Sequence, residues 1–358
     1  MDEREAMARA LDLAWRGWGR VQPNPLVGAV VISSDGRVVG EGWHAEFGDR
    51  HAEPVALEAA GERARDATLV TTLEPCNHRG KQPPCTDAVL ASGVRRLVVA
   101  MPDPNPEAGG GAARLAAQGV EVRTGLEREA AEAQNAIFLH RFRDTARPFV
   151  ALKLATSVDG RIADASGQSR WISGEAAREY VHWLRAGFDA IAVGGRTARQ
   201  DDPQLTVRGA VEPRSPPRRV VFDTAAELGT DLTLVRTAAE VETILVAAPD
   251  APTANLRRLE LAGVVVLRAA SLAEGLGRLH EAGIGSLLVE GGGRLAGALL
   301  GEGLVDRHYW IQSPLWLGER GIPAFADLPG DPIARVDRWT VVDRRALGDD
   351  TLLVLDHR

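Results

Sequence analysis

The two cysteines of this 358-residue chain constrain it more than any other feature. Cys76 and Cys85 lie nine positions apart in one short segment, and His51 and Glu53 precede them. One imidazole and two thiolates form a ligand set that zinc accepts. Structural zinc sites usually have four protein ligands, whereas three leave one position open for water. The sequence therefore predicts an enzyme that holds one zinc ion per chain.

Glu53 supplies the acid–base group that such a site needs. A histidine, two cysteines and a nearby glutamate are typical of zinc deaminases, in which the glutamate moves protons during loss of ammonia. That class commonly has a Cys-x-x-Cys spacing, so the match is to the class and not to its usual form. Two alternatives stay open. The cysteines could form a disulfide, which a cytosolic protein disfavours, or His51 and Glu53 could be surface residues ahead of a helix.

Strand and helix patterns alternate along the first half of the chain. Valine-rich strand patterns cover residues 27–32, 38–40, 67–73 and 97–100, and helical patterns cover residues 6–14 and 54–64. Cys76 follows the third strand, and we expect a helix to begin there. The N-terminus of such a helix would lower the pKa of the Cys76 thiol and favour the thiolate that zinc requires. Apolar strands each followed by a helix predict an α/β sheet covered on both faces.

A basic, polar segment that ends in proline, residues 141–149, separates the halves of the chain. We place the domain boundary there, with a first domain at 1–145 and a second at 146–358. Further α/β strand patterns follow at 150–155, 190–195, 219–223 and 286–290. Glycines 291–293 then precede a helix, where backbone N–H groups could bind a phosphate, although such turns are often purely structural. The acidic residue that completes a dinucleotide-binding fingerprint is missing downstream.

Charge and hydropathy limit the partners of the chain. A net charge of −7 argues against nucleic acid, which requires a basic face. No apolar run is long enough to span a bilayer, and the acidic N-terminus has no signal-peptide core. We therefore expect a cytoplasmic enzyme that acts on a free small molecule, without nucleic-acid or membrane partners. We also expect a homo-oligomer.

Longer motifs run through both halves of the chain in one order. In the first half they are 23–28, 51–53, 74–78, 81–85 and 103–106; in the second they are 152–161, 169–173, 201–208 and 290–293. Together they resemble the bifunctional deaminase/reductase family of riboflavin biosynthesis. The resemblance implies two α/β domains: a cytidine-deaminase-like three-layer α/β/α domain and then a dihydrofolate-reductase-like domain. It implies hydrolytic deamination of 2,5-diamino-6-ribosylamino-4(3H)-pyrimidinone 5′-phosphate and then NADPH-dependent reduction of the ribosyl group to ribityl.

The resemblance also implies roles for individual residues. Zinc would be held by His51, Cys76 and Cys85, with Glu53 as proton shuttle and Lys153 as the catalytic residue of the reductase. The deaminase pocket would contain Asn24, His44, His78, Lys81, Asp103 and Asn105. NADPH would meet Ala155, Trp171, Thr197, Asp201, Thr224, Gly292, Gly293, Arg294, Leu295, Ala296, Gly297 and Ala298. The reductase substrate would meet Ser169, Arg185, Leu205, Arg208 and Glu290.

Two other functions stay open at this point. A deaminase of another free nucleoside or nucleotide, fused to an unrelated domain, would carry the same zinc set. The acidic charge disfavours a nucleic-acid deaminase, and Lys81 beside the zinc loop suits a single phosphate. A binding protein with a structural zinc would instead need a fourth ligand, for which His44 and His78 are the close candidates. Hydrolytic release of ammonia would exclude this last function.

Overall fold

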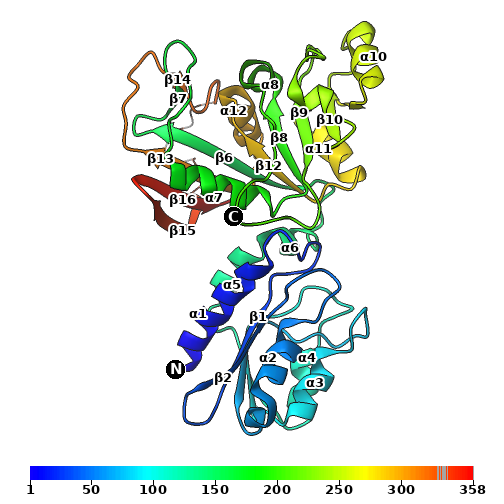
Figure 1. Cartoon of the computed structure of the whole chain (residues 1–358), viewed down its shortest axis with the longest axis vertical. Helices are drawn as coiled ribbons and strands as arrows, with labels where there is room; N and C mark the ends of the chain where they lie inside the picture. The colour runs from blue at the N-terminus through cyan, green and yellow to red at the C-terminus, as the bar shows by residue number, and fades with distance from the viewer. Residues whose placement is uncertain (329, 331, 333–335, 337, 358) are drawn as a thin grey trace. The chain divides into compact units, whose positions relative to one another are not determined.

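Two separate sheets organise the chain, which the computed structural model describes over residues 1–328, 330, 332, 336 and 338–357 (Figure 1). Within these residues, a five-stranded sheet and a nine-stranded sheet form, together with a two-stranded one. The chain divides into two units, Met1–Asp144 and Thr145–Arg358. Each unit has its own hydrophobic core. No helix in the described ranges is long and apolar enough to cross a membrane.

The sheet of the first unit has the order β2-β1-β3-β4-β5. Its strands are β1 (Gly28–Ile32), β2 (Val38–Trp43), β3 (Thr68–Leu73), β4 (Arg96–Met101) and β5 (Glu121–Thr124). β1 is antiparallel to β2 and β3, whereas β3, β4 and β5 are parallel. The middle strands are buried along almost their whole length, which explains their continuous apolar sequences.

Helices cover both faces of this sheet (Figure 1). One face carries α1 (Glu3–Ala14) and α5 (Arg128–Gln134), and the other carries α2 (Ala52–Ala60), α3 (Cys85–Ser92) and α4 (Gly111–Ala117). A short helix, α6 (Ala136–His140), follows α5. α2 lies directly on β2, where a Cβ atom on Gly40 or Gly42 would come within 2.1 or 2.4 Å of a helix carbonyl oxygen. The two glycines therefore allow the close approach that positions the start of α2.

The helix expected at Cys76 does not form. Residues 74–84 have neither helical nor strand structure, and α3 begins instead at Cys85. Pro83 and Pro84 lie immediately before the first turn of α3. Because the residue before a proline disfavours helical backbone angles, the helix cannot easily begin further toward the N-terminus. The helix expected at 54–64 begins two residues earlier, at Ala52, with Pro54 in its first turn, and it ends as a 3₁₀ turn over Gly61–Ala64.

The larger sheet of the second unit has the order β11-β10-β9-β8-β12-β6-β13-β16-β15. The strands from β11 to β13 are parallel: β6 (Phe149–Ser157), β8 (Ala190–Gly194), β9 (Arg218–Phe222), β10 (Thr243–Ala247), β11 (Val265–Arg268), β12 (Ser286–Glu290) and β13 (Arg307–Ser313). β16 (Asp350–Asp356) and β15 (Thr340–Leu347) extend it in antiparallel fashion. β7 (Arg161–Ala163) pairs separately with β14 (Ile322–Pro323).

Alternate residues of these parallel strands enter two different cores. In β8, Ala190 and Ala192 pack with α11 (Leu272–Glu281) and α12 (Gly293–Gly301), whereas Ile191 and Val193 pack with helices on the opposite face. Those helices are α8 (Gly195–Asp201), α9 (Thr233–Arg236) and α10 (Thr253–Leu261). α7 (Glu175–Arg185) connects β7 to β8. This two-residue alternation follows from the pleat of a strand and gives a sheet with helices on both sides.

Candidate active sites

The predicted zinc ligands lie together in the first unit. His51 caps the N-terminus of α2, Cys76 lies in the loop after β3, and Cys85 is the first residue of α3. His51 Nδ1 is 3.2 Å from Cys85 Sγ and 3.5 Å from Cys76 Sγ. The three ligand atoms lie within 4.8 Å of one another, and both cysteines are free thiols. One nitrogen and two sulfurs at this separation fit the donor set of a zinc ion, and no disulfide forms.

Hydrogen bonding within this cluster favours a thiolate. The Cys85 thiol and backbone N–H bond to the Cys76 sulfur, and this outweighs burial and lowers the pKa of Cys76 to about 4. The thiol proton of the pair stays on Cys85, because its bond to Cys76, together with burial, raises the pKa of Cys85. The bond to Cys76 raises the pKa of His51. The cluster thus already concentrates negative charge where a cation would bind.

Glu53 lies beside the cluster on the first turn of α2. Its side chain is almost fully buried, with 3% of its surface exposed. Burial raises the pKa of Glu53 to about 7, although the nearby His51 opposes the shift. Glu53, His51 and Cys76 line one cavity of about 240 Å³. The carboxyl group therefore lies where it can exchange a proton with a molecule held in that cavity.

The same cavity contains every residue expected in the deaminase pocket: Asn24, His44, His78, Lys81, Asp103 and Asn105. His44 is held on both sides, since its Nδ1 is 3.1 Å from the Arg50 carbonyl and its Nε2 is 3.1 Å from Asn24 Nδ2. Burial lowers the pKa of His44, so the ring is neutral near pH 7. Among the residues that the structure describes, the ligand cluster has three members and includes neither His44 nor His78.

Sequence reasoning missed several residues of this cavity. Phe47 and Phe138 supply apolar walls, and Gln82 also lines the space. The Lys81 ammonium lies 3.9 Å from the centre of the Phe47 ring, and Gln82 Nε2 donates to the Gly48 carbonyl at 2.9 Å. These contacts join the loop after β2 to the zinc loop. No local pattern marks Phe47 or Phe138, because only the folded chain brings them to the cavity.

The second unit contains a larger cavity, of about 1410 Å³, at the carboxyl ends of its parallel strands. This is the end of an open α/β sheet at which ligands bind. Its walls include the expected residues Lys153, Ala155, Ser169, Trp171, Arg185, Thr197, Asp201, Leu205, Arg208, Thr224, Glu290, Gly292, Gly293, Arg294, Leu295 and Ala298. A space of this size can accept a dinucleotide together with a second small molecule.

Ala296 and Gly297 do not line this cavity. Ala296 is fully buried in the core beneath α12, and a Cβ atom on Gly297 would lie 2.1 Å from the Ala326 carbonyl oxygen. Both residues belong to the face of α12 that packs against the protein. The preceding turn does face the cavity, and Gly291 and Gly292 have φ values of +80° and +87° that favour glycine.

A cluster of three charged residues lies in the wall of this cavity. Lys153 of β6 and Glu290 of β12 are register partners on adjacent parallel strands. Arg185, at the end of α7, donates to both Glu290 carboxylate oxygens, at 2.6 and 2.8 Å, and to the Thr206 carbonyl at 2.8 Å. Burial would raise the pKa of Glu290, but Arg185 and Lys153 lower it below its ordinary value. Burial lowers the pKa of Lys153, while Glu290 opposes this shift.

His182 is a further cavity residue that sequence reasoning missed. It lies one turn before Arg185 on α7, and its Nδ1 atom is buried without a hydrogen-bond partner. Burial and the positive charges of Arg185 and Arg208 lower the pKa of His182. A lone histidine on a helix carries little signal, and its orientation toward the cavity depends on the packing of α7.

Family comparisons agree with this division into two sites. Residues 1–101 match the family model described as the cytidine and deoxycytidylate deaminase zinc-binding region. Residues 148–353 match the model described as the RibD C-terminal domain. The first unit is therefore cytidine-deaminase-like and the second is a dihydrofolate-reductase-like reductase domain. Together they define a bifunctional deaminase and reductase.

Full-length relatives identify the family. The chain is 39% identical over 386 residues to the riboflavin biosynthesis protein RibD of Escherichia coli K12, covering 99% of each chain. Acinetobacter baumannii RibD is similar at 36% identity and a TM-score of 0.80, covering 99% of this chain and 98% of that one. The Thermotoga maritima deaminase/reductase is similar at 35% identity and a TM-score of 0.81, with the same coverage. The chain belongs to the RibD family of riboflavin biosynthesis enzymes, whose cofactors are zinc and NADPH.

Proposed function

We propose that the first unit deaminates 2,5-diamino-6-ribosylamino-4(3H)-pyrimidinone 5′-phosphate and that the second unit reduces the ribosyl group of the product. The observation that carries this proposal is the His51, Cys76 and Cys85 cluster with Glu53 in the same cavity. The similar Thermotoga maritima structure is described as a diaminohydroxyphosphoribosylaminopyrimidine deaminase and 5-amino-6-(5-phosphoribosylamino)uracil reductase, which supports both the substrate and the order of the steps.

In the deaminase, we assign zinc binding to His51, Cys76 and Cys85. Zinc, when bound, supplies the Lewis acidity that makes water nucleophilic at neutral pH. Glu53 passes one proton of the attacking water to the ring nitrogen and the other to the leaving amine, so the amino-bearing ring carbon becomes a carbonyl, the ring nitrogen gains a hydrogen and ammonia leaves. Neutral His44 accepts from the Asn24 amide and so fixes Asn24, whose remaining amide groups orient the heterocycle through hydrogen bonds.

The remaining deaminase residues suit the anionic and polar parts of this substrate. Lys81 supplies a positive charge at the edge of the cavity, where it can bind the 5′-phosphate. Asp103 and Asn105 lie in the loop after β4, where their side chains can accept and donate hydrogen bonds to the substrate. The Asp103 carboxylate stabilises this loop by accepting a hydrogen bond from the Asn105 backbone N–H at 2.9 Å. The cavity of about 240 Å³ fits a single pyrimidine ring with its substituents.

In the reductase, we assign NADPH to the glycine turn before α12 and to the cavity wall formed by α8. Thr197 lies against the turn, because a Cβ atom on Gly292 would be 3.1 Å from its Oγ1. NADPH, when bound, supplies the hydride for the ribosyl carbon. Opening the sugar ring also requires a proton at the ring oxygen, and Lys153, held beside Glu290, donates it. Ser169, Arg185, Leu205 and Arg208 line the space for the substrate.

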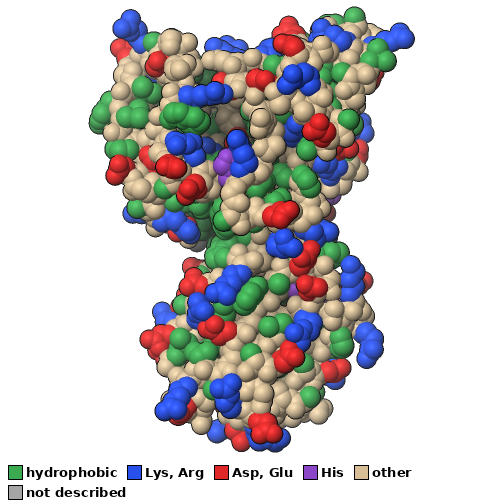
Figure 2. Space-filling model, in the orientation of Figure 1, with side chains coloured by type: hydrophobic (Ala, Val, Ile, Leu, Met, Phe, Trp, Pro, Cys, Tyr) green, Lys and Arg blue, Asp and Glu red, His purple; other side chains and the backbone are tan. Residues whose placement is uncertain are grey.

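The proposal includes a location and an assembly state. A cytoplasmic location would keep Cys76 and Cys85 reduced and available to zinc. Homo-oligomer formation is tested by size-exclusion chromatography with light scattering. Basic and acidic side chains are intermixed on the molecular face in Figure 2, which supports a small-molecule substrate over nucleic acid.

The test of this function follows ammonia and NADPH separately. Zinc-loaded protein is incubated with the diaminopyrimidinone ribosyl phosphate, first without and then with NADPH, and cytidine serves as the control substrate. We expect ammonia before NADPH is added and NADPH oxidation afterwards. Ammonia from cytidine alone would replace the proposed substrate by another nucleoside. No ammonia from either compound would overturn the deaminase proposal.

A further inference from the structure

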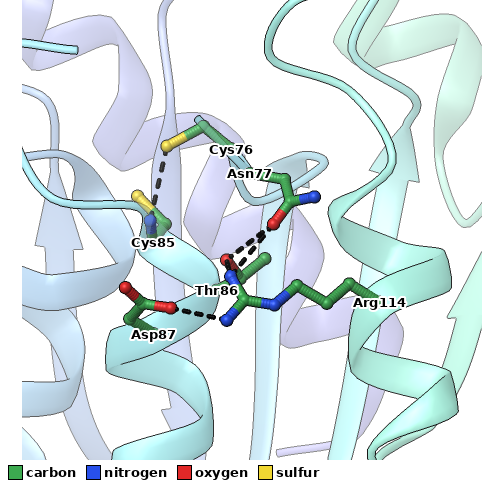
Figure 3. A network of polar contacts seen from close by, with 6 residues as sticks. All are labelled: Cys76, Asn77, Cys85, Thr86, Asp87 and Arg114. Atoms are coloured by element: carbon green, nitrogen blue, oxygen red, sulfur yellow. Dashed lines mark hydrogen bonds and ion pairs between the residues drawn. The ribbon is translucent and has the colours of Figure 1, made fainter. Parts of the chain in front are cut away.

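Arg114 of α4 connects the two chain segments that carry the cysteines (Figure 3). Its Nη1 donates to Asn77 Oδ1 at 3.0 Å and to Thr86 Oγ1 at 2.7 Å, and its Nη2 donates to Asp87 Oδ1 at 2.8 Å. Asn77 directly follows Cys76, and Thr86 directly follows Cys85. One guanidinium group therefore bonds the neighbours of both sulfur-bearing residues without contacting either sulfur.

The segment between the cysteines depends on such contacts for its shape, because residues 77–84 form no helix or strand. Three further hydrogen bonds hold the residues at its two ends. Thr86 Oγ1 donates to Asn77 Oδ1 at 3.2 Å, the Thr86 amide donates to the Cys76 carbonyl at 3.3 Å, and the Asn77 amide donates to the Ala108 carbonyl at 2.9 Å. Thr86 is fully buried, so its hydroxyl needs these partners.

α4 itself is fixed to the same segment by contacts that do not involve Arg114. A Cβ atom on Gly111 would lie only 1.9 Å from the Pro75 carbonyl oxygen, so α4 and the cysteine loop are in direct backbone contact. Glu74 accepts from the Ala112 amide at 2.9 Å and from the Asp103 amide at 3.1 Å. Arg114 therefore extends from an anchored helix, and its planar fork can hold Asn77 and Thr86 in a fixed arrangement.

We propose that Arg114 is a positioning residue of the zinc site, which sets the separation of the Cys76 and Cys85 sulfurs by bonding the residues that follow them. This inference rests on the proposed zinc ligand set and extends it to a residue outside the cavity. Metal sites lose affinity when the residues behind their ligands are removed, because the ligands no longer hold their geometry. Loss of Arg114 would leave the Cys76 and Cys85 segments joined by the bonds of Thr86 and by the Cys85 amide, which donates to the Cys76 sulfur.

The test measures zinc release from the full-length, zinc-loaded protein into an excess of a chromogenic chelator. We expect Arg114→Ala to release zinc roughly tenfold faster than the unmodified chain. Arg123→Ala is the matched control, because Arg123 is an arginine of the same unit that pairs with Glu3, away from the cysteines. It should release zinc at the unmodified rate. Equal rates for Arg114→Ala and the unmodified chain would overturn the proposal.

A double-mutant cycle separates positioning from general loosening of the unit. Thr86→Val removes one acceptor of Arg114 with little change in shape, and it remains measurable if Arg114→Ala folds poorly. We expect Thr86→Val to speed zinc release less than Arg114→Ala, and the double variant to release zinc more slowly than the two separate effects multiplied would give, since the bond between Arg114 and Thr86 is lost in both single variants. Additive effects would contradict the proposal. Zinc release needs no pyrimidine, so a chain that shows the expected rates but releases no ammonia would refute the proposed substrate alone.

Discussion

Glu53 and Glu290 line the cavities of the first and the second unit, and their pKa values shift in opposite directions. Glu53 lies beside the zinc ligands, and burial raises its pKa to about 7 although His51, a backbone N–H and the Cys85 thiol favour its charged form. Glu290 is more exposed, with 12% of its side-chain surface accessible, but it accepts two hydrogen bonds from Arg185 and lies beside Lys153, and its pKa falls below the ordinary value. The environment thus suits Glu53 to moving a proton and Glu290 to holding a fixed charge.

The two sites also differ in how the chain assembles them. The zinc cluster and Glu53 come from residues 51–85, whereas Lys153, Arg185 and Glu290 meet only because β6 and β12 are neighbours in the sheet. The first cavity is small and the second is several times larger, at about 240 and 1410 Å³. A compact motif can hold one ion and one ring, while a dinucleotide and a sugar need the width of several strand ends.

The largest expected effect separates the roles of the two glutamates. Glu53→Gln keeps the size of the side chain but cannot carry the proton, so we expect ammonia release to fall by about three to four orders of magnitude. Zinc content should stay unchanged, because the ligands are untouched. NADPH oxidation with the deaminated intermediate should also survive. If both activities fell together, the two-site division would be wrong.

Glu290→Gln should instead act on stability as well as on reduction. The substitution leaves Arg185 and Lys153 buried without a countercharge, which costs roughly 3–5 kcal/mol in the free energy of unfolding. NADPH oxidation should fall with it, while ammonia release continues. Denaturant unfolding of the full chain, followed by tryptophan fluorescence, measures the loss. An unchanged unfolding midpoint would show that the charged cluster does not stabilise the second unit.

The pH dependence of the stability that Glu290→Gln loses gives an internal control. Because the pKa of Glu290 is lowered from its ordinary value of 4.5, its contribution to stability is present in full above pH 4.5. The contribution is lost as the pH falls through the lowered value. The stability gap between the unmodified chain and Glu290→Gln should therefore narrow on acidification. A gap that widened would contradict the ion pair.

Lys153→Ala tests the proton donor on the other side of this cluster. We expect NADPH oxidation to fall by about a hundredfold, because the substrate loses its acid, while ammonia release is unaffected. Measuring NADPH oxidation with the deaminated intermediate isolates the second step. Normal oxidation would remove Lys153 from the reductase site.

His182→Ala should give the smallest effect and would refine the map of the larger cavity. His182 lines the larger cavity one turn before Arg185, so we expect its ring to contact the reductase substrate. Loss of this contact should raise the KM for the reductase substrate about tenfold and leave the KM for NADPH unchanged. His280→Ala, an exposed histidine on α11, is the control. A rise in the KM for NADPH alone would place His182 on the nucleotide side.

Local sequence signals predicted the zinc ligands with Glu53 and the strands of both sheets that are buried on two faces, whereas the other site residues were implied only by the family resemblance. The strand patterns correspond to β1, β3, β4, β6, β8, β9 and β12, because strands buried on both faces are continuously apolar. The helix expected at Cys76 was wrong because the prolines before Cys85 move the helix start to that residue. Ala296 and Gly297 belong to the packed face of α12, which a glycine-rich motif does not distinguish from its exposed face.

What the sequence determined by itself is the chemistry of the sites: two thiols, an imidazole and a carboxyl group in one short region, and a glycine turn after a strand. Thiols, an imidazole and a carboxyl group so close together in a sequence have few uses other than metal binding and proton transfer, so their spacing predicts the chemistry of the site. Tertiary structure alone decided which neighbours support them. Arg114 reaches the cysteine loop, Phe47 covers Lys81, and Lys153 meets Glu290 only after α4, the loop after β2 and the strands of the larger sheet are in place. Such contacts depend on packing between distant segments, which no local pattern records.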